Sequence, residues 1–240
     1  MDVVEELCVF SGLSLGEVRL RMDEQIARTA RLFNEFEGGA ESFYRSTDAY
    51  LFELANWEED SHRSELAAVL GGGLGGKRLS VLEYGCGIGS FALKLAEQGF
   101  IVTACDVNEP CLTFLRQRVA RRQWEQHVNV TSPDDALSVG PVYGLISCQH
   151  VLEHVTNPLH TLIRFRDCLM PGGMFVGIAP FSMVGPEFPE HDPKNAHLRL
   201  SSLCEEAGLR VEAIVPFGQV GNYTFELVQA LKMDEQRKTP

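Results

Sequence analysis

A glycine-rich turn that directly follows an apolar segment constrains the fold of this chain more than any other feature. The segment 79–82 is mainly apolar and leads into Glu83, and a helical pattern begins at Ser90. Between them lie three glycines at alternate positions, Gly85, Gly87 and Gly89. Open α/β sheets build nucleotide-type pockets from such a strand, turn and helix, because glycine takes positive φ and leaves room for a ligand.

The residues around this turn argue against a dinucleotide. The dinucleotide motif needs its third glycine one position later, where this chain has Ser90. That motif also places a pyrophosphate at the helix N-terminus, and Glu83 would set a negative charge beside it. An acidic residue at this position is expected to favour a cationic ligand.

From residue 79 onward, strand and helix patterns alternate, which predicts a parallel sheet with helices on both faces. Further strands are expected over 100–105, 128–131, 143–148, 174–179, 209–215 and 223–231. Asp106 follows the second strand, about twenty residues after the glycines, where a carboxylate accepts hydrogen bonds from ribose hydroxyls. Asn108 is expected to cap the next helix.

These motifs together resemble the class I S-adenosylmethionine (SAM)-dependent methyltransferases, in particular the small-molecule branch that includes quinone-biosynthesis O-methyltransferases. The resemblance rests on Glu-x-Gly-x-Gly-x-Gly at 83–89, on Asp106, on VLEHV at 151–155 and on L-x-PGG at 169–173. It covers roughly residues 78–231. It implies a seven-stranded, mostly parallel, doubly wound α/β sheet of the Rossmann-like methyltransferase fold, with the last strand inserted antiparallel.

The resemblance also implies SAM as the cofactor, S-adenosylhomocysteine as its product and a small-molecule acceptor for the methyl group. Two aspartates, Asp134 and Asp135, follow the third strand. Either could accept the adenine amino group, or could only cap a helix. The residues expected to bind the cofactor are Glu83, Gly85, Cys86, Gly87, Gly89, Asp106, Val107, Asn108, Asp134, Asp135, Gln149, His150 and Tyr44.

Two histidines follow the fourth strand, at the edge of the sheet that faces the transferred methyl group in this fold. His150 is the first candidate for a general base that reaches the acceptor, because histidine titrates near neutral pH. His154 is the second catalytic candidate, or a structural residue that hydrogen-bonds across the loop.

The same segment raises the alternative of a divalent metal site. His150, Glu153 and His154 have a spacing that can place ligands on one helix face, and His191 or His197 could complete the set. In the small-RNA 2′-O-methyltransferases and quinone O-methyltransferases that bind such an ion, glutamate stands where this chain has His150. We therefore expect a metal-free site.

The chain divides into three predicted parts. Residues 1–76 form an N-terminal helical lid that ends in a glycine hinge, 77–233 form the SAM-binding domain, and 234–240 form a polar tail. The first part could close over the active site, or it could be a helical layer packed permanently on the core. Its residues expected near cofactor or substrate are Tyr44, Arg45, Tyr50 and Trp57.

Composition narrows the class of protein. The formal net charge of −12 argues against nucleic acid as a partner, and the basic run at 116–122 is expected to be an exposed helix face. Seven cysteines without a Cys-x-x-Cys pair, and an acidic start without a signal-peptide pattern, indicate a reduced, cytoplasmic protein. No segment is apolar enough to span a bilayer. We expect a monomer or a homodimer.

The favoured function is a SAM-dependent methyltransferase that transfers a methyl group to O, N or C of a small molecule by in-line displacement. Two other classes stay open. A SAM-binding partner protein without turnover would form no product with any acceptor. A nucleotide-linked oxidoreductase would bind NAD tightly and would not bind SAM. The complete set of Glu83, glycine turn and Asp106 favours the enzyme.

Overall fold

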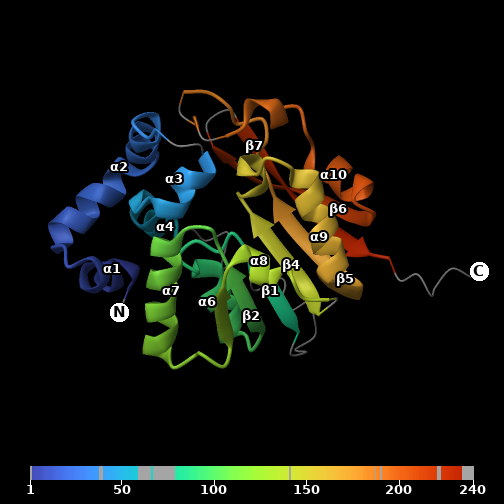
Figure 1. Ribbon diagram of the computed structural model, residues 1–240, viewed down its shortest axis with the longest axis horizontal. Helices are drawn as coiled ribbons and strands as arrows, with labels where there is room; N and C mark the ends of the chain where they lie inside the picture. Colours follow the sequence, from blue (N-terminus) through green and yellow to red (C-terminus); the bar gives the residue numbers. More distant parts are fainter. Residues whose placement is uncertain are drawn as a thin grey trace, which may run out of the picture.

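The computed structural model describes residues 2–37, 40–58, 66, 79–140, 142–186, 188–189, 191–220 and 223–233. A sheet of seven strands lies at the centre of this part, with helices on both faces (Figure 1). The strands are β1 Ser80–Tyr84, β2 Ile101–Cys105, β3 Val128–Thr131, β4 Tyr143–Gln149, β5 Leu169–Ile178, β6 Leu209–Val220 and β7 Tyr223–Lys232. The predicted hinge at 71–76 and the tail at 234–240 lie outside the described residues.

The strand order β3-β2-β1-β4-β5-β7-β6 places the first strand in the middle of the parallel part of the sheet. β1 pairs in parallel with β2 on one side and with β4 on the other, whereas β7 runs antiparallel between β5 and β6. This confirms the predicted mostly parallel sheet with an inserted antiparallel last strand. The register aligns Tyr84 with both Cys105 and Cys148, so β1, β2 and β4 reach the same edge.

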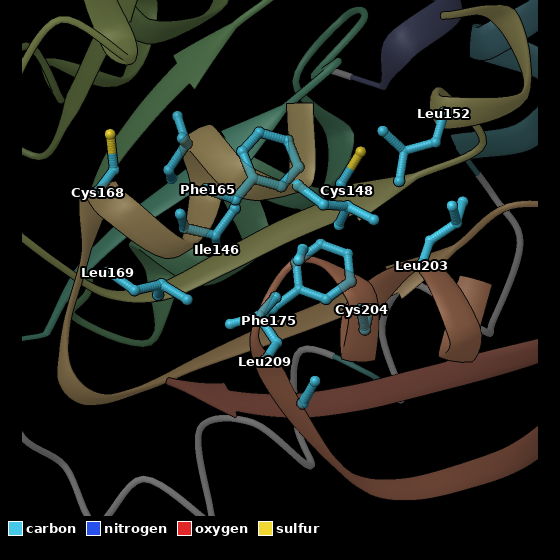
Figure 2. Close-up of a cluster of buried hydrophobic side chains, with 14 of the residues drawn as sticks. Ile146, Cys148, Leu152, Phe165, Cys168, Leu169, Phe175, Leu203, Cys204 and Leu209 are labelled. Carbon is cyan, nitrogen blue, oxygen red and sulfur yellow. The ribbon is translucent and has the colours of Figure 1, made fainter. Parts of the chain in front are cut away.

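Helices cover the two faces of the sheet because alternate strand residues point in opposite directions. Val81 belongs to the core under α6 and α7, and Leu82 belongs to the core under α9 and α10. Figure 2 shows the second core, where Ile146, Phe165 and Phe175 lie close together. The helices of these layers are α6 Ser90–Glu97, α7 Glu109–Arg122, α8 Pro133–Ala136, α9 Pro158–Cys168 and α10 Leu200–Glu206.

The N-terminal helices, which we call the cap, form a group beside α7 (Figure 1). They are α1 Val3–Ser11, α2 Leu15–Asn34, α3 Ala40–Ser46 and α4 Ala49–Glu58. Asp2 and Ser14 begin α1 and α2 with capping boxes. Buried residues of α1, α2 and α4 pack with Ile88 of the glycine turn and with Phe114 of α7. None of the helices in the described ranges is long and apolar enough to cross a membrane.

A buried ion-pair network joins the cap to α7. Arg118 is 2% exposed, and its Nε donates to Glu6 Oε2 at 2.7 Å. Its Nη1 and Nη2 donate to Glu58 at 2.8 and 2.5 Å, and Nη1 also donates to the carbonyl of Ile88 at 2.9 Å. Ser90 Oγ donates to the same Glu58 carboxylate at 2.5 Å. The prediction that the whole basic run faces solvent is therefore wrong for Arg118, because the cap covers this side of α7.

Three segments add detail to the predicted elements. The segment 169–173 directly follows α9 and already belongs to β5, ahead of the strand expected at 174–179, and Leu169 pairs with Tyr143 next to a register shift. The two aspartates that follow β3, Asp134 and Asp135, lie in α8, which Ser132 caps by accepting from Asp135 N–H at 3.2 Å. β6 extends past 215 to Val220 because its antiparallel pairing with β7 continues.

Replacing Arg118 with methionine is expected to destabilise the fold, because it leaves the buried carboxylate of Glu6 and the partly buried carboxylate of Glu58 without this guanidinium. Removing one partner of a buried ion pair costs about 3–5 kcal/mol. Arg116→Met is the matched control, since the Arg116 side chain is 46% exposed on the same helix and exposed pairs contribute about 0–1 kcal/mol. Urea unfolding followed by circular dichroism measures both variants. If both variants lost the same free energy of unfolding, the ion-pair network would not be what holds the cap against α7.

Candidate functional site

Backbone hydrogen bonds hold the glycine turn against the end of β2. The N–H groups of Gly85 and Cys86 both donate to the carbonyl oxygen of Cys105, at 2.8 and 3.0 Å. Gly87 has a φ of +53°, and a Cβ there would lie 2.5 Å from Leu54 Cδ1 of the cap. Glycine is therefore favoured at this position by the backbone conformation and by the close approach of α4.

Asp106 joins this turn to the loop that follows β2. Its Oδ2 accepts from the Gly87 N–H at 2.7 Å, and its Oδ1 accepts from the Asn108 N–H at 2.8 Å. Burial raises the pKa of the Asp106 carboxyl, and these backbone hydrogen bonds oppose the shift. The structure thus places Asp106 at the glycine turn, and its contact with ribose stays a prediction.

Two carboxylates beside the glycine turn, Glu83 and Asp106, make its surroundings negative, and a third, Glu53, is buried within the cap. Glu83 is 7% exposed, and Glu53, on α4, is 8% exposed. Burial raises the pKa of the Cys86 thiol well above its usual value, and the nearby carboxylates of Asp106 and Glu83 raise it further. Burial also raises the pKa of the Glu53 carboxyl, against a hydrogen bond from Thr29 at 2.5 Å. Such surroundings favour a cationic ligand.

The histidine end of the site begins directly after β4. His150 has a φ of +55°, which is uncommon for a residue other than glycine, and its N–H donates to Ile178 O at 2.9 Å. The 3₁₀ turn η1 (Leu152–His154) follows. It places the buried carboxylate of Glu153 near two imidazoles, with Oε1 3.8 Å from His150 Nδ1 and 4.0 Å from His154 Nε2. Backbone strain of this kind clusters at functional sites.

The cap contributes aromatic side chains to both histidines. The Tyr44 hydroxyl is hydrogen-bonded to His154 Nδ1 at 2.9 Å, and the Tyr50 hydroxyl donates to the Tyr44 hydroxyl at 3.0 Å. The ring centroid of Trp57 lies 6.2 Å from that of His150, in an edge-to-face arrangement. Tyr44, which we expected among the cofactor contacts, is therefore placed at the histidine end.

The long loop after β5 brings a third histidine to the same place. His191 is 7% exposed, and its ring centroid lies 4.6 Å from that of His154. Burial lowers the pKa of His191 to about 4, so this imidazole is neutral at neutral pH. Three side chains could hold a metal ion together, because one ligand atom from each lies within 4.8 Å of the other two: Glu153, His154 and His191. Neither His150 nor His197 belongs to this group. Neutral imidazoles and a carboxylate are ligands that fit a divalent transition metal.

Asn108 and Val107 share the loop of Asp106. Asn108 caps α7 as predicted, with its Oδ1 accepting from the Cys111 N–H at 2.8 Å. Gln149, the last residue of β4, donates from Nε2 to Ser147 Oγ at 3.0 Å. The cofactor contacts of these residues stay predictions.

The two aspartates after β3 have different surroundings. The N–H and a carboxylate oxygen of Asp135 both bond to Ser132 Oγ, so this residue takes part in capping α8. The Asp134 side chain is 92% exposed and lies 3.7 Å from Arg164 in an ion pair. These contacts do not test whether Asp134 or Asp135 accepts the adenine amino group, which stays a prediction.

The sequence reasoning missed the cap residues that lie against the glycine turn and the start of α6, which are Leu54 and Glu58. They lie in a helical segment dense in aromatic residues, where the pattern predicts a helix and gives no sign of which face meets the turn. That face is set by docking against α7. The buried Arg118 could have been suspected only from its central position between apolar residues of α7.

The chain is similar in sequence to known methyltransferases. A family model described as a methyltransferase domain matches residues 62–214. The ubiquinone biosynthesis O-methyltransferase of Vibrio vulnificus (strain YJ016) is 31% identical over 102 residues, which are 42% of this chain and 43% of that protein. The match therefore spans less than half the length of this relative.

Two solved structures have a similar fold. A 1,6-didemethyltoxoflavin-N1-methyltransferase from Burkholderia thailandensis, with bound 1,6-didemethyltoxoflavin and S-adenosylhomocysteine, matches with a TM-score of 0.59 at 21% identity, over 74% of this chain and 81% of its own. The mitomycin 7-O-methyltransferase MmcR matches with a TM-score of 0.64 at 14% identity, over 97% of this chain and 73% of its own. At these identities the likeness shows the fold alone.

Replacing Glu53 with glutamine is expected to stabilise the protein increasingly as the pH rises. The pKa of Glu53 is raised in the folded state, so the wild type loses stability as the pH rises from the unfolded pKa through the raised folded value. The neutral amide has no such loss. Urea unfolding of both proteins from about pH 4.5 to 8 measures the difference.

The control for this experiment is Glu97→Gln, at an exposed position on α6. Its difference in stability from the wild type should not change with pH. If the difference in unfolding free energy between Glu53→Gln and the wild type were constant over this pH range, the raised pKa of Glu53 would be contradicted.

Proposed function

Because this chain belongs to the methyltransferase-domain family of class I SAM-dependent enzymes, we propose that it transfers a methyl group from SAM to a small-molecule acceptor. The acceptor atom is O, N or C. The names of similar proteins, an O-methyltransferase of ubiquinone biosynthesis and an N1-methyltransferase of 1,6-didemethyltoxoflavin, support an acceptor of this size. A histidine base suits best an acceptor that carries an O–H or N–H.

The observation that carries the proposal is that both ends of the site follow neighbouring strands at one edge of the sheet. β1, β2 and β4 reach the same edge, so Glu83 with the glycine turn, Asp106 and His150 lie at adjacent strand ends. Ligands of open α/β sheets bind at this carboxyl edge. A cofactor held by the turn would extend along the edge toward the histidines.

The residues at the cofactor end serve mainly to bind SAM and to orient it. SAM, when bound, supplies a methyl group that its sulfonium has already activated. The carboxylates of Glu83 and Asp106 favour a cation, and Asp106 also offers oxygens to ribose hydroxyls. The backbone N–H groups and glycines of the turn allow close approach without a Cβ.

At the histidine end the tasks are proton removal and exclusion of water. His150 accepts the acceptor's proton, and the Glu153 carboxylate near it stabilises the imidazolium that forms. Tyr44 orients His154 through its hydroxyl. Trp57 covers His150 and keeps water from the acceptor.

The group formed by Glu153, His154 and His191 favours a second candidate, a methyltransferase that depends on a divalent metal. These three residues would hold the ion, which would polarise an acceptor oxygen and lower its pKa. This set differs from the one expected from the sequence, because His150 lies outside it. Family membership sets the oxidoreductase alternative aside, and a SAM-binding partner without turnover stays the alternative from another class.

We place the enzyme in the cytoplasm, as a monomer or a homodimer. Seven free cysteines support a reducing compartment. The formal net charge of −12 supports a partner other than nucleic acid.

SAM is expected to bind the wild type, and Asp106→Ala is expected to weaken this binding. Leaving the partners of a buried carboxylate unsatisfied costs about 1–3 kcal/mol, or roughly 5–150-fold in affinity. Isothermal titration calorimetry measures both proteins, with Asp23→Ala, at an exposed position of α2, as the control. A wild type that gives no heat with SAM would end the proposal.

His150→Ala is expected to lower kcat by about 10²–10⁴-fold while leaving SAM affinity nearly unchanged. Release of S-adenosylhomocysteine with a panel of small phenols and amines is the assay, and wild-type activity should fall with acid as the imidazole is protonated. His197→Ala, in the exposed part of the loop, is the control.

The same assay distinguishes the metal-dependent mechanism from the metal-free mechanism in which His150 is the base. If His191→Ala and a chelator abolish activity and elemental analysis finds one divalent ion per chain, the metal-dependent reading replaces the metal-free one. Full activity of His150→Ala would contradict its role as the base.

A further inference from the structure

We propose that Asn108 is a positioning residue that fixes the acceptor side of the site to the cofactor loop, so that cofactor binding assembles the acceptor side. The inference rests on the proposed function and extends it to a coupling between the cofactor side and the acceptor side of the site. It is carried by four hydrogen bonds of one buried residue. Asn108 is 3% exposed.

The side chain of Asn108 joins two helices that are far apart in the sequence. Its Oδ1 accepts from the Cys111 N–H at 2.8 Å and so caps the N-terminus of α7. Its Nδ2 donates to Tyr44 O at 2.6 Å and to Thr47 O at 2.8 Å. These two carbonyls belong to the last turn and the end of α3, where carbonyl groups lack partners within the helix. One amide therefore caps the start of α7 and the end of α3.

α3 depends on such contacts for its position. It has seven residues, and a helix of this length is not stable in isolation. Its buried Phe43 packs edge-to-face against Phe33 and Phe36 of the neighbouring cap segment. Asn108 is a second anchor of α3. On the same helix, the Tyr44 hydroxyl is hydrogen-bonded to His154 Nδ1 at 2.9 Å.

The backbone of Asn108 completes the connection to the cofactor. Its N–H donates to Asp106 Oδ1 at 2.8 Å, and Asp106 is the carboxylate proposed to accept the ribose hydroxyls. A continuous path of contacts thus runs from the ribose carboxylate through Asn108 and Tyr44 to His154. A ligand that orders the Asp106 loop stabilises α3, and by linkage an ordered α3 strengthens binding of that ligand.

The test uses two variants that keep the cap of α7 and remove the donors to α3. Asn108→Asp keeps the Oδ1 acceptor and replaces the amide by an oxygen facing two carbonyls, and Asn108→Ser keeps an acceptor without that repulsion. Asn157→Asp is the matched control, because Asn157 caps α9 in the same way, through the His160 N–H at 3.0 Å, and makes no contact of this kind with the cap. Hydrogen exchange of residues 40–50 is measured with and without S-adenosylhomocysteine.

In the wild type and in Asn157→Asp, S-adenosylhomocysteine is expected to slow exchange in 40–50. In both Asn108 variants, exchange there without ligand is expected to be roughly tenfold faster, the slowing by ligand is lost, and exchange in β1 and β4 is unchanged. A purely structural role would accelerate exchange throughout the sheet. Unchanged exchange in 40–50, with intact ligand binding, would overturn this inference alone. A wild type that does not bind S-adenosylhomocysteine would overturn the proposed function, and with it the coupling.

Discussion

The common end of β1, β2 and β4 is the constraint on which the rest of the site depends. Parallel strands in register present their loops at one edge, and here the register aligns Tyr84, Cys105 and Cys148. The chain leaves β1 toward β2 and β3 and then crosses to β4 on the other side. The loops after β1 and β4 therefore lead in opposite directions, which is where open α/β sheets bind ligands. The carboxylates of Glu83 and Asp106 lie on one side of this point, and the imidazoles lie on the other side together with the carboxylate of Glu153.

The cap is fastened to this edge by polar contacts as well as by apolar packing. Arg118 connects two cap carboxylates with the backbone of the glycine turn, and Asn108 connects the end of α3 with the start of α7. Buried charged and amide groups are costly unless all their partners are in place. Such contacts therefore favour one docked position of the cap over others that apolar packing alone would permit.

The sequence was sufficient for the sheet and for the position of the glycine turn and Asp106 at its edge, because both depend on local patterns. The apolar strands, the glycines at alternate positions and the carboxylate at Asp106 each mark a position relative to a strand end, and the register then brings them together. The capping role of Asn108 followed for the same reason. These features need no knowledge of which distant segments touch.

The parts that could not be predicted depend on contacts between distant segments. Nothing near Arg118 shows that α1 and α4 cover it, and the pattern of four arginines is typical of an exposed face. Likewise His191 lies 37 positions from His154 in the sequence. The sequence offered His191 and His197 equally as additions to the set, and only the fold shows that His191 joins Glu153 and His154 while His150 lies outside the group. The hydrogen bond between Tyr44 and His154 likewise depends on how α3 docks toward η1, which no local pattern shows, and the contact of Tyr44 with the cofactor stays a prediction.

The docked cap also has a consequence for how such a protein can change over evolution. A domain boundary near residue 76 would suggest that the N-terminal segment can be exchanged with the corresponding segment of a related protein. Arg118 and Asn108 belong to the sheet domain, yet their partners Glu6, Glu58 and the end of α3 belong to the cap. A recombinant that exchanged one part would leave a buried guanidinium and a buried amide facing unsuitable neighbours. The two parts are therefore constrained to be inherited together, and substitutions within the cap are tolerated more easily than its replacement.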